Sequence, residues 1–363
     1  MHPRLFLALV LSTLTTQAAS AEETQTTVLL QSWATVWDQD ENPQADPAGY
    51  GDPEHDPGVS LQRARLGLQG KTDQLSYAVV VGASAPYDAL VEGSTSVQIV
   101  DAVVGWHLDK DAFDLGISIG QQKVPVGREM LIGAHQLLFQ ERSIHSAWLL
   151  PGREAGLIVD AELDSGLRAR LGAFNGNGSV WGDNNPGLLG SARLEYAKGD
   201  TYQTYSTKDE SAFGFGLSAF YNSDLATREL GLGTDVLLRF SGFNLLLDVA
   251  QTTLQPADST LAVPEVMAKT ARLGGGVQLS MNLPLSQGTL EPGLRLAYYD
   301  DNMDFEDNGD VATLHAGLTW HDAAPGLDLG AGFVHREELQ GATAANDTLR
   351  LWVQFSNKER NQP

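Results

Sequence analysis

The sequence predicts an all-β protein: a transmembrane antiparallel β-barrel of about 16 strands, with its third outer loop folded inward. Three observations predict this fold. Segments of about ten residues alternate apolar with polar or small residues, the period of a strand with two different faces. Short and long connections alternate between these segments. One connection, near 121–155, is far longer than ordinary and carries many apolar and charged residues.

The N-terminal residues have the pattern of a secretory signal. Arg4 precedes an apolar run from Leu5 to Leu14, and Ala19-Ser20-Ala21 is a small-x-small cleavage site. The alternative, a membrane anchor helix, is disfavoured because the run is short for a bilayer. Residues 1–21 are therefore predicted to be removed after export, and residues 22–363 to form a barrel in the bacterial outer membrane.

Composition excludes several classes of protein. The formal net charge is −23, which argues against nucleic acid as a partner because such binding needs a basic face. After the signal no apolar stretch is long enough for a transmembrane helix. There are no cysteines, hence no disulfides, and the eight histidines are scattered without metal-ligand spacing. No metal or cofactor is expected.

The alternating segments follow one another from residue 26 to residue 356. In the second, Arg63 and Arg65 share a face with Gly67, while Leu66 and Leu68 take the other. About sixteen such segments lie near 26–37, 59–70, 74–84, 97–108, 112–121, 156–163, 167–174, 187–197, 212–222, 228–240, 243–254, 271–282, 288–299, 310–321, 327–336 and 346–356.

The connections favour an outer-membrane barrel, which has an even strand number, short turns on one rim and long loops on the other. Lys71-Thr72-Asp73 and Ser241-Gly242 have the composition of tight turns, whereas 38–58 and 121–155 are long. The gap at 198–211 breaks the rule, because it is long where a short turn is expected. It indicates either a small excursion or an error of register.

A soluble β-sandwich is the alternative fold, since it also has two-faced strands. The polar face here is lined with glycine and arginine while the other face is evenly apolar, which is the reverse of a dry core. Aromatic residues also cluster near strand ends, as at a membrane interface. These features favour the barrel.

The stretch from Gly120 to Gly156 differs from the alternating segments. Apolar residues such as Met130, Phe139 and Trp148 need burial, which argues against disorder. Charged residues stand among them. We interpret the stretch as a loop folded into the mouth of the barrel, with its apolar side against the wall and its charges facing a water path.

Part of the chain resembles the phosphate-selective porin O and P family. The matching pieces are QRARLGLQGK (62–71), VDAVVGWHL (100–108), GQQKVPVGREM (120–130), FQERS (139–143), PGREAGLIVDAEL (151–163) and LGAFNGNG (171–178). Their order and spacing carry the match over 59–176. The resemblance implies a homotrimeric porin in outer-membrane lipid and lipopolysaccharide, either general-diffusion-like or anion-preferring, with the loop after the fifth strand folded into the pore.

The resemblance also implies a positive constriction. The matching cations are expected to line the pore and bind anions such as phosphate; they are Lys123, Arg128, Arg142, Arg153, Arg63 and Arg65. Guanidinium groups bind phosphate oxygens in pairs and an ammonium acts as a point charge. Each loop cation has a second interpretation, bracing the loop against Glu129, Glu141 or Glu154.

Carboxylates on the predicted lumen face depart from a strong anion filter. They are Asp101, Asp114, Asp160, Glu162, Glu195, Asp235, Asp248 and Glu291. Their candidate partners are Arg168, Arg170, Arg193, Arg239, Arg272 and Arg295. Complete pairing would leave no net positive field, so a cation-tolerant channel without phosphate selectivity stays open.

Other candidate sites are weaker. The acidic loop 38–58 has oxygen donors for a divalent cation but lacks the spacing of a calcium loop, so a solvated loop is favoured. A barrel hydrolase using His145 and Ser146 is a second class of function, yet no Gly-x-Ser-x-Gly motif is present. The chain is not expected to be an enzyme. A plugged structural or adhesion barrel is a third class.

Overall fold

The computed structural model describes residues 23–38, 58–84, 97–110, 112–176, 187–203, 210–223, 227–257, 269–307, 309–341 and 347–357. Its strands are β1 (Glu23–Asp38), β2 (Gly58–Lys71), β3 (Leu75–Ser84), β4 (Val97–Lys110), β5 (Phe113–Lys123), β6 (Arg153–Leu163), β7 (Leu167–Phe174), β8 (Leu189–Lys198), β9 (Ala212–Ser223), β10 (Thr227–Phe240), β11 (Phe243–Pro256), β12 (Thr270–Met281), β13 (Leu283–Pro284), β14 (Thr289–Asp300), β15 (Val311–Ala324), β16 (Leu327–Glu338) and β17 (Thr348–Ser356).

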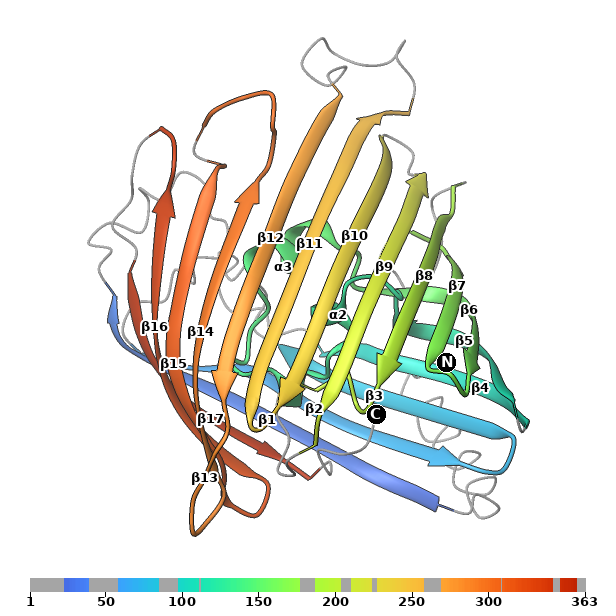
Figure 1. Cartoon of the computed structure of the whole chain (residues 1–363), viewed down its shortest axis with the longest axis horizontal. Coiled ribbons are helices and arrows are strands. Elements are labelled where there is room, and N and C mark those ends of the chain that lie inside the picture. The colour runs from blue at the N-terminus through green and yellow to red at the C-terminus, as the bar shows by residue number, and fades with distance from the viewer. Residues whose placement is uncertain are drawn as a thin grey trace, which may run out of the picture.

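The strands form one closed antiparallel barrel (Figure 1). Each long strand pairs with the next one in the chain, and β1 closes the ring by pairing with β17, with Leu30 opposite Phe355. β13 is a two-residue strand that follows β12 and pairs with β14. The remaining sixteen strands make the wall, which confirms the predicted fold class and excludes a two-sheet sandwich.

The two faces of the wall differ as the alternation predicts. Large apolar side chains such as Leu66, Leu232 and Leu351 are exposed on the outside. Polar side chains such as Gln31 and Asp235 are fully buried on the inside. In a membrane, the outer face meets lipid and every backbone group of the closed sheet finds a partner within it.

The two strand boundaries that flank the long connection differ from the prediction. β5 continues to Lys123 and β6 begins at Arg153, opposite each other in the ladder, so the long connection is 124–152. We call 124–152 the inner segment. For the connection at 198–211, the predicted register of the flanking strands is correct, because Lys198 of β8 lies opposite Phe213 of β9. The signal and most of the first acidic loop lie outside the described residues.

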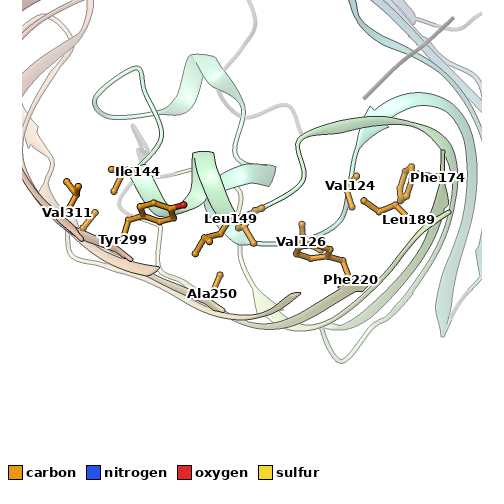
Figure 2. Close-up of a cluster of buried hydrophobic side chains, with 12 residues drawn as sticks. Val124, Val126, Ile144, Leu149, Phe174, Leu189, Phe220, Ala250, Tyr299 and Val311 are labelled. Atoms are coloured by element: carbon orange, nitrogen blue, oxygen red, sulfur yellow. The ribbon is translucent and has the colours of Figure 1, made fainter. Parts of the chain in front are cut away.

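The inner segment contains α2 (Arg128–Leu131), the 3₁₀ turn η1 (Ala134–Gln136) and α3 (Ile144–Leu149). No described helix is long and apolar enough to cross a membrane. The segment packs against the concave side of the wall, where its residues Val124, Val126 and Leu149 form a buried cluster with Phe220 and Tyr299 (Figure 2). Apolar burial therefore holds the segment on one side of the barrel.

Candidate functional site

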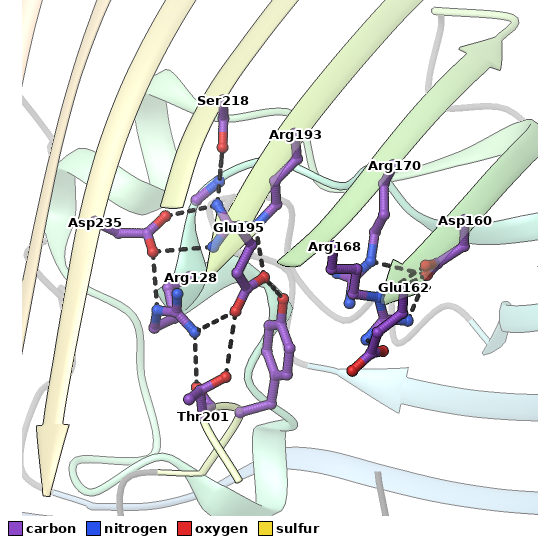
Figure 3. A network of polar contacts seen from close by, with 12 residues as sticks. Arg128, Asp160, Glu162, Arg168, Arg170, Arg193, Glu195, Thr201, Ser218 and Asp235 are labelled. Atoms are coloured by element: carbon purple, nitrogen blue, oxygen red, sulfur yellow. Dashed lines mark hydrogen bonds and ion pairs between the residues drawn. The ribbon is translucent and has the colours of Figure 1, made fainter. Parts of the chain in front are cut away.

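The start of the inner segment is anchored by a buried ion-pair network (Figure 3). Arg128 Nε and Nη1 lie 2.8 Å from carboxylate oxygens of Asp235 on β10 and Glu195 on β8. Arg193 of β8 contacts the same two carboxylates, at 2.6 Å from Asp235 and 3.2 Å from Glu195. The Arg128 side chain is 0% exposed. Although it was expected to line the pore, Arg128 braces the inner segment and lies away from the water path.

A second network holds the rest of the segment. Glu129 accepts hydrogen bonds from Ser143 N at 3.0 Å and from Arg295 Nη1 at 3.3 Å. Glu141 lies 3.3 Å from His315 Nδ1 and 3.4 Å from Arg350 Nη1. Both carboxylates thus hold the shape of the loop. Beside them, burial lowers the pKa of His145 to about 4, Arg295 acting in the same direction and Glu129 against it.

Inward-facing glycines make room for the segment on the wall. A Cβ at Gly214 of β9 would lie 2.8 Å from the guanidinium atoms of Arg128, and one at Gly276 of β12 would lie 2.8 Å from His145 Cε1. A Cβ at Gly317 of β15 would lie 2.9 Å from Phe139 Cε1. Real Cβ atoms do not approach so closely, so the close fit requires residues without side chains at these positions.

The open part of the lumen lies along β1–β7. A cavity of about 390 Å³ is lined by Arg65, Asp101, Lys123 and Arg153 from the wall, and by residues 133–136 of the inner segment. A second cavity of about 400 Å³ shares Lys123, Arg168 and Arg170 with the first and reaches Lys71, Asp109 and Asp114 near the short-turn rim. Together these cavities form the candidate water path.

Three cations contact uncharged oxygen atoms: Lys123, which lines both cavities, and Arg63 and Arg142, which lie within electrostatic range of Arg65. Lys123 Nζ donates to the carbonyls of Leu131 and Ile132 at 2.7 and 2.8 Å. Arg142 Nη2 donates to the Ile132 carbonyl at 3.0 Å. Arg63 Nη1 donates to the Gln140 carbonyl at 2.5 Å and to Gln31 Oε1 at 2.8 Å. These contacts orient the cations without cancelling their formal charge.

Arg153 and Arg65 complete what we call the cation cluster: Arg63, Arg65, Lys123, Arg142 and Arg153. Arg153 pairs with both oxygens of Asp101, at 2.8 and 3.2 Å. Arg65 makes no hydrogen bond or ion pair with any residue that the structure describes, yet it lies within electrostatic range of Arg63, Arg142 and Arg153, and of the Asp101 carboxylate. Burial, and after it the charge of Arg63, lowers the pKa of Arg142 to about 10, so it remains a cation at neutral pH.

Three of the six suggested arginines, Arg168, Arg170 and Arg193, pair with carboxylates of the predicted lumen face. Asp160 accepts hydrogen bonds from Arg168 Nε at 2.8 Å and Arg170 Nε at 3.0 Å. Arg295 and Arg272 pair instead with Glu129 and Glu229, which were not among their suggested partners. Pairing is therefore extensive away from the cation cluster, whereas five of the six predicted site residues gather within it.

Sequence reasoning missed Tyr202, which also lines the first cavity. The sequence did contain an indication of this residue. Tyr202 lies in the connection 198–211, which is longer than the other connections on the short-turn rim. Sequence reasoning also missed the inward-facing apolar residues Phe174, Leu189 and Phe220, which break the polar pattern of the lumen face where the inner segment covers it.

The barrel is similar to several solved structures. They include Pseudomonas putida OprB in a high-pH structure, with a TM-score of 0.62, 10% identity and coverage of 95% of this chain and 96% of that one. They include an anion-selective porin from Comamonas acidovorans, with a TM-score of 0.60, 12% identity and coverage of 92% and 99%. They also include the outer-membrane channel DcaP of Acinetobacter baumannii, with a TM-score of 0.56, 11% identity and coverage of 92% and 97%. At these identities the similarity establishes the fold.

Sequence comparison adds the family. Among curated proteins none matches this chain. The family profile described as phosphate-selective porin O and P matches residues 40–214, the part that contains the inner segment and all five residues of the cation cluster. The resemblance to phosphate-selective porin O and P is thus confirmed over residues 40–214, and the barrel has the fold of the porins.

Proposed function

We propose that the channel passes small hydrophilic solutes with a preference for anions, inorganic phosphate among them. The observation that carries this proposal is the position of the Arg65 guanidinium. This guanidinium lines the cavity without a hydrogen-bonding partner among the described residues, and the cations that act on it, Arg63, Arg142 and Arg153, outnumber the one carboxylate, Asp101. Like charges held this close repel one another, and a passing anion relieves that repulsion. Guanidinium groups bind phosphate oxygens in a fixed, two-point geometry.

The cation cluster suits passage better than tight binding. Lys123, Arg142 and Arg63 already donate to protein oxygens, so an anion competes for part of their bonding capacity. Conduction requires several sites of moderate strength, because one strong site would hold the ion. The series from Arg65 to Lys123, with Arg168 and Arg170 next along the cavities, supplies such sites.

The acidic net charge of −23 does not oppose this preference. Salt screens exposed charges beyond about 8 Å at physiological ionic strength, so a permeant ion responds to the groups that line its path. Many lumen carboxylates are neutralised locally, as Glu195 and Asp235 are by Arg128 and Arg193.

The resemblance further supports a homotrimer whose outer surface contacts lipid and lipopolysaccharide. A hydrolase gains no support from the residues that suggested it. His145 Nε2 and Ser146 Oγ lie 3.3 Å apart, but the two side chains are almost completely buried between the inner segment and the barrel wall. A solute in the described cavities reaches neither group.

The test is the zero-current potential of single channels in a KCl gradient across a planar bilayer. Anion preference sets the sign of this potential, and added phosphate is expected to reduce the chloride current by competing for the cation cluster. A potential of the opposite sign with no effect of phosphate would remove the anion proposal and leave a general-diffusion or cation-tolerant channel. Absence of any conductance would remove the channel itself.

A further inference from the structure

A second stretch of chain enters the lumen, from the short-turn rim opposite to the inner segment's rim. It follows β8 and comprises Gly199–Gln203. The Asp200 and Gln203 carbonyls accept hydrogen bonds from Arg239 Nη2 at 2.5 and 3.1 Å. The Thr201 carbonyl accepts one from Arg128 Nη1 at 3.1 Å. Thr201 and Gln203 are each 2% exposed, so this stretch is built into the interior.

Tyr202 is the residue of this stretch that reaches the cavity. Its hydroxyl donates to Glu195, the carboxylate that also pairs with Arg128. Its ring centroid lies 5.5 Å from Arg128 Cζ and 5.1 Å from Arg170 Cζ, within the range of cation–π attraction. The half-buried ring lines the same cavity as Arg65 and Lys123. A side chain held at both its ring and its hydroxyl cannot easily swing out of the path.

We infer that Gly199–Gln203 is a second constriction element and that Tyr202 is a specificity-determining residue of the channel. Two segments that enter from opposite rims meet at Arg128: the inner segment supplies the guanidinium, and the second stretch supplies the Thr201 carbonyl and the Tyr202 ring. The ring limits the width of the path and positions Arg170 beside it. This inference rests on the proposed function, because it concerns what the channel admits.

Three variants test the inference. Tyr202→Ala removes the ring and is expected to raise single-channel conductance and to admit larger anions. Tyr202→Phe keeps the ring and loses only the hydrogen bond to Glu195, so its conductance should stay near that of the wild type. Tyr202→Cys exploits the absence of cysteine from the natural chain. Charged methanethiosulfonate reagents should then change the current through this variant, with opposite effects on anion selectivity for reagents of opposite charge.

The matched control is Tyr221→Cys on β9. Tyr221 is 45% exposed on the outer face, so reagent at that position should not alter the current. The inference is overturned if the wild type conducts while Tyr202→Ala leaves conductance unchanged and reagent has no effect on Tyr202→Cys; channel function then still stands. If the wild-type protein forms no channel, the proposed function and this inference fall together. Tyr202→Cys and Tyr202→Phe keep the test valid should Tyr202→Ala fail to fold.

Discussion

Arg65 provides the sharpest prediction at the scale of single residues. Arg65→Gln keeps a polar side chain but removes a charge that no described residue neutralises by direct contact. We expect the zero-current potential to shift toward cations and phosphate competition to weaken, since a mobile anion is the partner being lost. The matched control is Arg272→Gln, whose guanidinium pairs with Glu229 and does not line the two cavities. Equal shifts in both variants would contradict a specific role for Arg65.

Arg128 has the opposite role, and its substitution is expected to act on stability. Arg128→Met leaves Glu195 and Asp235 with Arg193 as their remaining guanidinium in a fully buried site. Breaking a buried ion pair costs on the order of 3–5 kcal/mol, because the surviving charge loses compensation. Urea unfolding followed by tryptophan fluorescence should show this loss.

A second substitution separates charge from packing at this anchor. Adding Glu195→Gln to Arg128→Met removes one of the uncompensated carboxylates and should restore part of the lost stability. If Arg128→Met lowers the free energy of unfolding by less than about 1 kcal/mol, as is typical of an exposed ion pair, the network does not hold the inner segment.

The individual strands show how far the sequence determines the structure. The period of two predicted which residues of β7–β9 face inward, and closure of the ring followed from it. It did not predict what covers an inward face: Phe174, Leu189 and Phe220 are apolar there because Val124 and Val126 pack against them. Nor did spacing separate Arg128 from Arg142, because the roles of the two arginines depend on Glu195 and Asp235, distant in sequence.

The fit between β9 and the inner segment gives a prediction at the scale of an element. Gly214→Ala places a methyl group 2.8 Å from the Arg128 guanidinium, which two carboxylates hold in place. We expect a destabilisation of about 1–3 kcal/mol, as for other overpacked cores, and faster amide exchange in 124–152. Gly190→Ala on β8 is the control, because no atom lies within 4 Å of its added Cβ. Similar effects in both variants would argue against a requirement for glycine at position 214 to fit the inner segment against β9.

The whole molecule is asymmetric. The inner segment and the stretch Gly199–Gln203 fill the side of β8–β17 with buried ion pairs and apolar contacts, while the water path follows β1–β7. On the open side Arg65 has no hydrogen bond or ion pair with a described residue, and Lys123 donates to carbonyl oxygens. The filled side therefore contributes mainly to stability, and the open side mainly to the proposed selectivity. Conditions that titrate the filled side should displace the inner segment while the residues of the cation cluster keep their formal charge.

Acidic pH is such a condition. The pKa of His145 is about 4 in the folded protein against an ordinary value of 6.5, so the unfolded chain binds the proton more readily below pH 6.5. Stability from the neutral ring is complete above pH 6.5 and falls as the pH drops toward 4, by on the order of 3 kcal/mol in total. Protonation of Glu129 at lower pH also reduces the stability of the folded protein. Burial raises its pKa, but Arg295 and the Ser143 hydroxyl outweigh burial and lower it overall.

We therefore expect acid to loosen the inner segment while the barrel stays closed, because the sixteen-strand ladder depends on neither group. Single-channel records should show more frequent closures and greater noise at pH 5 than at pH 7. His145→Gln cannot acquire the charge, so its records should change less over this interval, and Glu129 should contribute to any remaining change at lower pH. Records of His145→Gln that follow the wild type at every pH would place the acid-sensitive group elsewhere in the channel.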